Sequence, residues 1–431
     1  MKKIISAVLS ATLAVSSIGA VYASADEKYG DGKNIVVFGD SIAEGYDLSG
    51  TEYNYGQIIA DYIGGNVSNY AKAGDETTDT LSKIKESTDL KDADVVIISS
   101  GANDVIHYSS NFMLKLFSRM GCLAEGYTAD DIPENPAFSQ MMQMIDVDKL
   151  KSSLSDVSEA LKFNNEITRL ANNLTITDSN RNYEQYDRVI QTKVIANTEQ
   201  MVAEIKAVNP DARIIVQNIY NPLQLEENYV PDKYKQMFAL FKPTFERVVD
   251  SYVEQLDGVE GVEIADIYTD FTAGDGYAWY FTGFEDASVK EFKVHPNQAG
   301  HLAIAVNILN ILGEKNDDGG LLNLAYEKLD KKDQYPNMAL EKYRNIAGTY
   351  VLGNINGDTL IDANDATEVL ATYSALSTGQ ENPLSEENQK AADVNGDGNI
   401  DANDASNLLD YYAYSSTGGT SSLKRFQAEN K

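Results

Sequence analysis

Short apolar runs alternate with longer amphipathic stretches between residue 34 and about residue 313. Three runs, 34–38, 94–98 and 213–217, are rich in β-branched residues and are continuous rather than alternating. Such runs are typical of parallel strands that are covered on both faces. Segments such as 198–208 have the spacing of crossover helices, so the pattern predicts an α/β domain with a parallel sheet between helices. Residues about 106–181 lack clear strands, and we interpret them as a helical insertion.

The N-terminal pattern differs from the rest of the chain. Lys2 and Lys3 precede an apolar stretch that ends near Val21, and Ala23 and Ala25 supply a small-residue cleavage site. This arrangement predicts a secretory signal peptide, because the apolar stretch is too short and too interrupted for a membrane span. The 431 residues then divide into a signal peptide (1–25), an α/β domain (26–315), a linker (316–348), a repeat-containing domain (349–416) and a tail (417–431).

Composition and charge narrow the possible partners and sites. Lys and Arg number 35 against 66 Asp and Glu, which gives a net charge of −31. Such a surface repels phosphate backbones, so nucleic acid and anionic lipid are not expected as partners. A neutral substrate and bound cations are compatible with it. The single Cys122 and only three histidines exclude a disulfide framework, a cysteine-based zinc site and a multi-histidine metal centre.

Two twelve-residue stretches, 354–365 and 393–404, repeat at a spacing of 39 residues. Oxygen-bearing side chains fall at positions one, three, five, nine and twelve, and position seven offers a backbone carbonyl. This is the spacing of an EF-hand-type calcium loop, in which a hard cation gathers six or more oxygens. The predicted ligands are Asn354, Asn356, Asp358, Leu360, Asp362 and Asp365 in the first loop, and Asp393, Asn395, Asp397, Asn399, Asp401 and Asp404 in the second.

A helix is predicted after each loop, and no matching helix is predicted before either. Leu370 and Tyr373 recur as Leu409 and Tyr412 at the same offset. This duplicated half-motif, over about 349–416, resembles a dockerin, the module that binds cohesin on a cellulosome scaffold. The resemblance implies a small all-α domain that holds two structural Ca²⁺ ions.

The two dockerin-like loops are not equivalent. Asn354 replaces the usual Asp at position one, and Thr359 stands where glycine eases the turn, so we expect weaker calcium binding in the first loop. Positions ten and eleven are Ala and Asn in both loops, at 363–364 and 402–403. By resemblance these residues face cohesin, and the duplication would allow two binding orientations.

Four short blocks in the α/β domain carry candidate chemistry. The first strand leads into Gly39-Asp40-Ser41, Gly74 follows the second, Asn103 follows the third and His295 opens the last helix. In this order they resemble the SGNH (GDSL) hydrolases over residues 34–312, apart from the insertion. The resemblance implies a flavodoxin-like three-layer α/β/α sandwich that hydrolyses esters without a catalytic cofactor.

The residue types suit ester hydrolysis. Ser41 is the candidate nucleophile, and His295 is the candidate base that takes its proton and later protonates the leaving alcohol. The resemblance implies that the Ser41 N–H, the Gly74 N–H and the Asn103 amide stabilise the oxyanion. The other histidines, His107 and His301, fit packing roles better.

One position departs from the family pattern. Phe292 stands where the family usually has an Asp, three residues before the catalytic histidine. Three interpretations are open: Glu291 orients His295, a backbone carbonyl does so, or the triad is impaired.

Together these features predict a secreted cellulosomal serine esterase that removes acyl groups, acetyl first, from plant cell-wall polysaccharides. Acetylated xylan is the leading substrate and acetylated pectin the next. The alternatives are a GDSL lipase or lysophospholipase, and a catalytically impaired domain that acts as a binding module.

Overall fold

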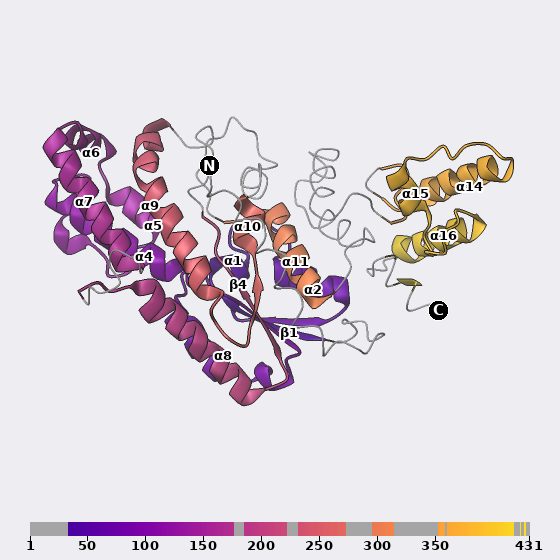
Figure 1. Cartoon of the computed structure of the whole chain (residues 1–431), viewed down its shortest axis with the longest axis horizontal. Coiled ribbons are helices and arrows are strands. Elements are labelled where there is room, and N and C mark those ends of the chain that lie inside the picture. Colours follow the sequence, from indigo (N-terminus) through magenta and orange to yellow (C-terminus); the bar gives the residue numbers. More distant parts are fainter. Residues whose placement is uncertain are drawn as a thin grey trace, which may run out of the picture.

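The computed structural model of the chain describes residues 33–175, 185–221, 232–272, 295–313, 352–357 and 360–417, with 423, 426 and 427. Its sheet has five parallel strands in the order β2-β1-β3-β4-β5 (Figure 1). This confirms the predicted parallel sheet, and the apolar runs of the sequence supply three of its strands. The strands are β1 (Asn34–Gly39), β2 (Asn66–Asn69), β3 (Val95–Ser99), β4 (Arg213–Gln217) and β5 (Glu263–Ala265).

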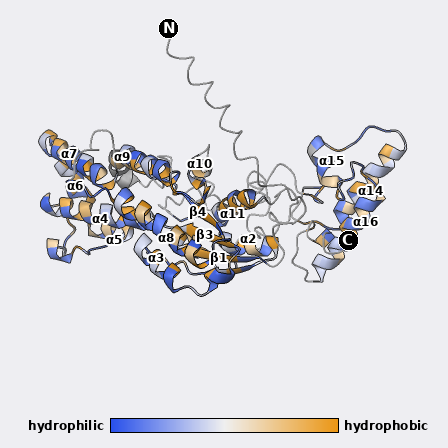
Figure 2. Cartoon of the chain, turned by 60° about the horizontal axis from the view of Figure 1, so that its bottom comes forward, coloured by the Kyte–Doolittle hydropathy of each residue, from blue (hydrophilic) through white to orange (hydrophobic). Residues whose placement is uncertain are grey.

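Alternate residues of β1 enter two different cores. Ile35 and Val37 pack with α2 (Tyr55–Ile63) and α11 (Gln298–Leu312), whereas Val36 and Phe38 face the opposite layer. Figure 2 shows the apolar strands enclosed between amphipathic helices. The α/β/α sandwich predicted from the sequence is therefore confirmed. The opposite layer contains α3 (Thr77–Glu86), α4 (Ala102–Arg119), α8 (Ala196–Val208) and α9 (Asp232–Leu256).

The described chain between β3 and β4 is largely helical. After α4 come α5 (Phe138–Met144), α6 (Val147–Leu154) and α7 (Val157–Leu174), and a π-helical turn (Ile190–Ile195) leads into α8. The connection extends the second core, since Met141, Phe163 and Leu170 are buried in it. In Figure 1 these helices lie to the left of the sheet.

The C-terminal repeat folds into helices α14 (Ala363–Ser377), α15 (Glu386–Ala392) and α16 (Ala402–Ser416). The sequence predicted no helix before either loop that matches the helices after them, but a short helix, α15, ends directly before Asp393 of the second loop. This helix is short and mostly polar, and a cap by Ser385 rather than an apolar stripe marks its start. Helices α14 and α16 pack against each other, with Val369 and Leu408 fully buried.

No helix in the described part of the chain is long and apolar enough to cross a membrane. The predicted signal peptide (1–25) and linker (316–348) lie outside the described residues. The domain boundaries themselves stay predictions.

Candidate active site

Ser41 lies on the sharp turn between β1 and the short helix α1 (Ser41–Glu44). Gly39 has a φ of +151°, and a Cβ there would lie 2.1 Å from the Ser99 carbonyl oxygen of β3. The turn can therefore pass this close to β3 only with glycine. Asp40 then caps α1, because its Oδ1 accepts a hydrogen bond of 3.0 Å from the Ile42 N–H. These local constraints place Ser41 at the carboxyl edge of the sheet, where open α/β folds bind ligands.

The Ser41 hydroxyl lies next to His295, which lies three residues before the first residue of α11, Gln298. His295 Nε2 is 2.9 Å from Ser41 Oγ, and His295 Nδ1 is 2.9 Å from Asp47 Oδ2. The Tyr46 ring lies against the imidazole, with 4.9 Å between the ring centroids. A hydroxyl, an imidazole and a carboxylate in this order can activate a serine, since the base takes the proton while the carboxylate orients it. The structure thus brings together the two side chains that the sequence singled out.

Asp47 occupies the position beside Nδ1 for which the sequence offered Glu291 or a backbone carbonyl. Glu291 and Phe292 lie outside the described residues. Asp47 has a φ of 70°, a left-handed conformation that Asp tolerates better than most residues. Gly45, which ends α1 in the left-handed conformation, marks the helix end in the sequence. The direction in which the chain then turns toward His295 is set by the fold.

The other two histidines are buried, and each interacts with another side chain of the core or of its surroundings. His301 stacks on Tyr55 with 5.9 Å between ring centroids, and burial, helped by His295, lowers its pKa to about 3. It is therefore neutral and belongs to the core. His107 Nδ1 lies 2.9 Å from Glu76 Oε1. Neither histidine contacts Ser41 in the described structure, which leaves His295 as the candidate base.

Gly74 lies on the loop that follows β2, and Asn103 lies in the first turn of α4, which follows β3; β2 and β3 are the neighbours of β1 in the sheet. The Gly74 loop runs beside the end of β1, where the Lys72 N–H donates to the Gly39 carbonyl at 3.0 Å. Gly74 has a φ of +87° with open space around its α-carbon. The Asn103 Nδ2 donates to the Asp75 carbonyl at 2.9 Å, and an amide NH₂ has a second proton to offer. Gly74 and Asn103 therefore follow the carboxyl ends of the two strands that flank β1, and their role as oxyanion donors stays a prediction.

Asp40 is the most unusual ionisable group near Ser41. It is buried, and burial raises its pKa to about 7 despite the Ile42 hydrogen bond; Asp104 and Asp75 raise it further. The carboxyl next to the candidate nucleophile therefore carries only part of its negative charge at neutral pH.

Comparison with known families agrees with this geometry. Residues 37–303 match the model of the GDSL-like lipase/acylhydrolase family. The chain belongs to this family. Residues 352–411 match the dockerin type I domain. Both resemblances inferred from the sequence motifs are confirmed: a GDSL-like hydrolase domain is joined to a C-terminal dockerin.

Solved structures similar to this GDSL-like protein are distant in sequence. They include a lipase from a goat rumen metagenome (14% identity, TM-score 0.36, covering 64% of this chain and 96% of that one). A phospholipase A1 from Streptomyces albidoflavus has 13% identity and a TM-score of 0.38, with coverages of 65% and 98%. A catalytic mutant of an acetylxylan esterase from Geobacillus stearothermophilus has 16% identity and a TM-score of 0.32, with coverages of 67% and 97%. No curated protein sequence matches the chain.

The dockerin loops use their acidic side chains to hold the loop backbone. Asp365 and Asp404, at position twelve, are fully buried. Asp404 accepts hydrogen bonds from the Asn395 and Asp401 N–H groups, at 3.1 and 2.9 Å. Asp393, at position one of the second loop, accepts bonds from the Asp397 and Gly398 N–H groups at 3.0 and 2.9 Å. These hydrogen bonds shape the backbone of the second loop, whereas calcium binding by either loop stays a prediction.

The donor chemistry of these loops fits calcium. Burial, together with the nearby negative charge of Asp393, raises the pKa of Asp404, and a bound cation would relieve this repulsion. Among the described residues, no three acidic, histidine or cysteine side chains converge on one point. Asp358 of the first loop lies outside the described residues. The two calcium sites consequently remain proposals.

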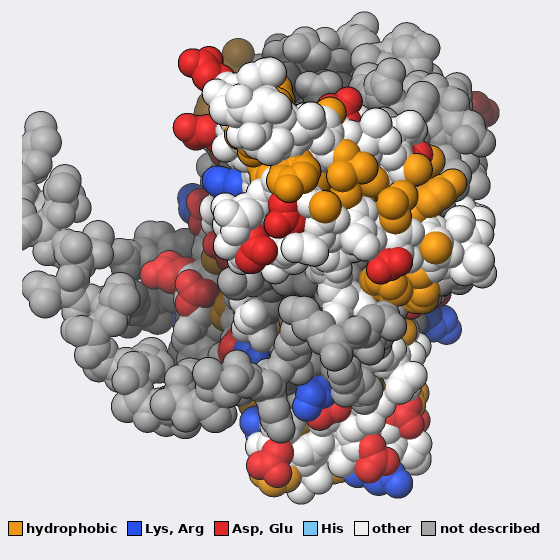
Figure 3. Space-filling view, turned by 90° about the vertical axis from the view of Figure 1, so that its right-hand side faces the viewer, with side chains coloured by type: hydrophobic (Ala, Val, Ile, Leu, Met, Phe, Trp, Pro, Cys, Tyr) orange, Lys and Arg blue, Asp and Glu red, His pale blue; other side chains and the backbone are white. Residues whose placement is uncertain are grey.

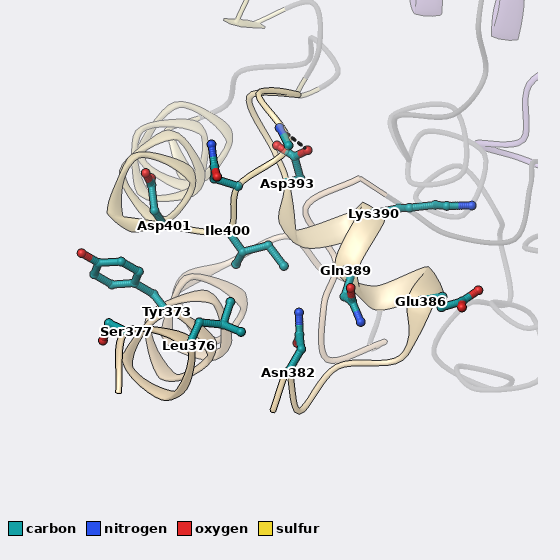
Figure 4. Close-up of a pocket in the computed structure, with 12 residues that line it drawn as sticks. Tyr373, Leu376, Ser377, Asn382, Glu386, Gln389, Lys390, Asp393, Ile400 and Asp401 are labelled. Carbon is teal, nitrogen blue, oxygen red and sulfur yellow. Dashed lines mark hydrogen bonds between the residues drawn. The ribbon is translucent and has the colours of Figure 1, made fainter. Parts of the chain in front are cut away.

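The two repeats also share a hollow of about 680 Å³ between α14, α15 and the second loop. Tyr373 and Leu376 of α14 lie beside Ile400, position eight of the second loop (Figure 4). Because a loop of one repeat packs on the helix of the other, the repeats form one unit rather than two separate motifs.

The dockerin helices keep several large apolar side chains in solvent. Leu370 and Tyr373 of α14 are 44% and 42% exposed, and Leu409 and Tyr412 of α16 are 44% and 41% exposed. Figure 3 views the molecule from the side of these helices and shows a band of hydrophobic side chains with acidic side chains beside it. Exposed apolar patches of this kind mark protein-binding surfaces.

Proposed function

We propose that the GDSL-like domain is a serine esterase that removes acyl groups, acetyl groups above all, from plant cell-wall polysaccharides. The observation that carries the proposal is the chain of two 2.9 Å contacts from Ser41 through His295 to Asp47. An impaired triad would lack a partner for His295 Nδ1, so this contact favours the enzyme over a binding module.

In the proposed reaction, Ser41 Oγ attacks the ester carbonyl carbon while His295 Nε2 takes the hydroxyl proton. The negative oxygen of the tetrahedral intermediate is stabilised by the Ser41 and Gly74 N–H groups and the Asn103 amide. His295 then gives its proton to the sugar oxygen as the bond between that oxygen and the carbonyl carbon breaks, so the sugar leaves with a free hydroxyl and the acyl group stays on Ser41. Water, deprotonated by His295, releases the acyl group as the free acid.

The decisive experiment compares wild type with Ser41→Ala on p-nitrophenyl acetate. We expect kcat to fall by at least about 10³-fold, because no other group described near His295 can accept the acyl group. Ser82→Ala is the matched control, since Ser82 is exposed on α3 and bonds only its own helix backbone. Equal rates for wild type and Ser41→Ala would leave the binding-module alternative.

The polysaccharide part of the proposal rests on the dockerin, since a cellulosome gathers enzymes that act on plant cell walls. Acetate release from acetylated xylan and acetylated pectin should exceed fatty-acid release from lysophosphatidylcholine. Rates on p-nitrophenyl esters should also fall as the acyl chain lengthens. The opposite order for both sets would favour the lipase alternative.

We further propose that the dockerin binds two Ca²⁺ ions and a cohesin module. The predicted ligands of both loops would hold the ions, and the second loop would bind more tightly. Ala363 and Asn364, with their repeats Ala402 and Asn403, are exposed at the starts of α14 and α16. These equivalent surfaces support binding to cohesin in two orientations.

Export is part of the same proposal, because cohesin scaffolds lie outside the cell. Cleavage after Ala25 would leave Asp26 as the first residue of the mature protein, and N-terminal sequencing of secreted protein tests this. A mature chain that still begins at Met1 would contradict it.

A further inference from the structure

A cluster of buried charges lies behind the candidate oxyanion donors, and the catalytic proposal does not use it. Lys193 Nζ is 2.5 Å from Glu76 Oε2 and 3.2 Å from Asp104 Oδ1. Both acids are buried, and the Lys193 side chain is only 35% exposed. Charges removed from water are costly unless paired, so this lysine holds the two carboxylates firmly.

Each acid belongs to a segment that carries one oxyanion donor. Glu76 lies two residues after Gly74 and begins α3, and its other oxygen is 2.9 Å from His107 Nδ1. Asp104 directly follows Asn103 in α4, and its two oxygens accept bonds of 2.8 and 2.9 Å from the N–H and hydroxyl of Thr77. Lys193 therefore ties the Gly74 loop to the first turn of α4.

Ionisation is favoured for Glu76 and Lys193, whereas burial raises the pKa of Asp104 in spite of its hydrogen bonds with Thr77 and the charge of Lys193. Hydrogen bonding to His107, followed by Lys193, lowers the pKa of Glu76 in spite of its burial. Burial opposes the charge on Lys193, but the Glu76 and Asp104 carboxylates outweigh it and raise the lysine pKa. The ammonium group is thus present throughout the neutral range and keeps both contacts.

The backbone around Lys193 is also special. Lys193 lies in the π-helical turn Ile190–Ile195, and such turns occur often at functional sites. The neighbouring Val194 packs against Gly101, where a Cβ would come within 2.7 Å of Val194 Cγ1. The π turn therefore rests directly on the residues that lead into Asn103.

We infer that Lys193 is a positioning residue of the oxyanion hole: by bridging Glu76 and Asp104 it sets the distance between the Gly74 N–H and the Asn103 amide. This inference rests on the proposed esterase function. A misplacement of about 1 Å at a catalytic group can cost about 10²-fold in rate. Loss of the bridge should therefore slow the chemical step while leaving ground-state substrate binding nearly unchanged.

The test is kcat and KM of Lys193→Met on p-nitrophenyl acetate, after wild type has shown activity that Ser41→Ala removes. We expect kcat to fall about 10- to 100-fold with KM within about 3-fold of wild type. Affinity for phenylboronic acid, which forms a tetrahedral anionic adduct on serine, should fall by a similar factor. Lys85→Met is the matched control, because Lys85 pairs with Glu204 between α3 and α8 at 3.6 Å and touches neither donor segment.

A double-variant experiment separates positioning from general stability. In an Asn103→Ala background, Lys193→Met should reduce kcat by no more than about 2-fold, since the Asn103 amide, whose distance from the Gly74 N–H the lysine sets, is already absent. Lys193→Gln serves for the same measurements if Lys193→Met does not fold. Wild-type kcat in the lysine variant, equal losses in Lys85→Met, or a full loss in the Asn103→Ala background would each overturn the inference. Inactive wild-type enzyme would instead refute the proposed function.

Discussion

Asp47 is a half-exposed carboxylate, yet it lies 2.9 Å from the imidazole that contacts Ser41. A surface ion pair contributes little to folding, typically about 0–1 kcal/mol. A carboxylate on Nδ1 nevertheless matters for catalysis, because it fixes the tautomer that presents Nε2 as a base and stabilises the imidazolium that forms. Loss of Asp47 is therefore expected to lower the catalytic rate and to change the stability of the fold very little.

Asp47→Asn should lower kcat on p-nitrophenyl acetate by about 10²- to 10⁴-fold, because the amide can stabilise the wrong imidazole tautomer. The melting temperature should hardly change. Glu291→Gln is the comparison, since Glu291 was the sequence-based candidate for the same role, and it should keep near wild-type kcat. If Glu291→Gln loses activity and Asp47→Asn does not, the orienting group is Glu291.

At the scale of single elements, two features of the turn from β1 into α1 are expected to lower the stability of the folded protein. Gly39 is required by its approach to Ser99, and the Asp40 cap is buried where its charge is disfavoured. A neutral cap would satisfy the Ile42 N–H without the cost of a buried charge. Strain of this type is common beside functional groups.

The buried cap predicts a pH-dependent stability. Because the folded pKa of Asp40 is raised from 3.8 to about 7, its contribution is fully present below about pH 4 and is lost as pH rises through about 7. Asp40→Asn should thus gain stability over wild type across this window, by at most about 4 kcal/mol. Urea unfolding followed by circular dichroism at pH 5 and pH 8 measures the difference.

The control for this experiment is Asp130→Asn, whose carboxylate is exposed in the helical connection. Its stability relative to wild type should be the same at both pH values. An Asp40→Asn difference that does not grow between pH 5 and pH 8 would show that Asp40 is ionised at no cost in the folded protein.

At the scale of the whole molecule, catalysis and anchoring use separate residues. The proposed calcium ligands all lie between residues 354 and 404, and the proposed catalytic residues between 41 and 295. Calcium stabilises only the module that binds it, by an amount that grows with the ratio of ion concentration to Kd. The two functions should therefore respond independently to metal removal.

EDTA should abolish capture by immobilised cohesin and lower the melting temperature of the dockerin transition, as measured by calorimetry and pull-down. Hydrolysis of p-nitrophenyl acetate should stay unchanged, because no proposed calcium ligand lies in the esterase site. Asp393→Ala should weaken capture more than Asn354→Ala, since it removes a carboxylate from the second loop, which we propose binds Ca²⁺ more tightly. Capture that survives EDTA, or a loss of hydrolysis with it, would contradict this separation.

The family and the parallel sheet were predictable from the chain because their signals are local. A buried strand needs a continuous apolar run, a turn against a neighbouring strand needs a residue such as Gly39, and a calcium loop needs oxygens at fixed spacing. Ser41, Gly74, Asn103 and His295 each follow or precede such an element. Ser41, Gly74 and Asn103 follow the carboxyl ends of neighbouring strands, which lie at the same edge because the sheet is parallel.

The contacts of Asp47 and Lys193, and the presence of helix α15, became evident only in the tertiary structure. Asp47 reaches His295 through a loop conformation. Lys193 reaches Glu76 over 117 residues of sequence because the π turn packs on α4. Helix α15 is short and polar, so its sequence has no repeating apolar positions from which a helix could be predicted. Periodic burial and turn sterics act within a few residues and can be read along the chain. A pairing between distant charges depends on how whole segments pack, and that exists only in the folded protein.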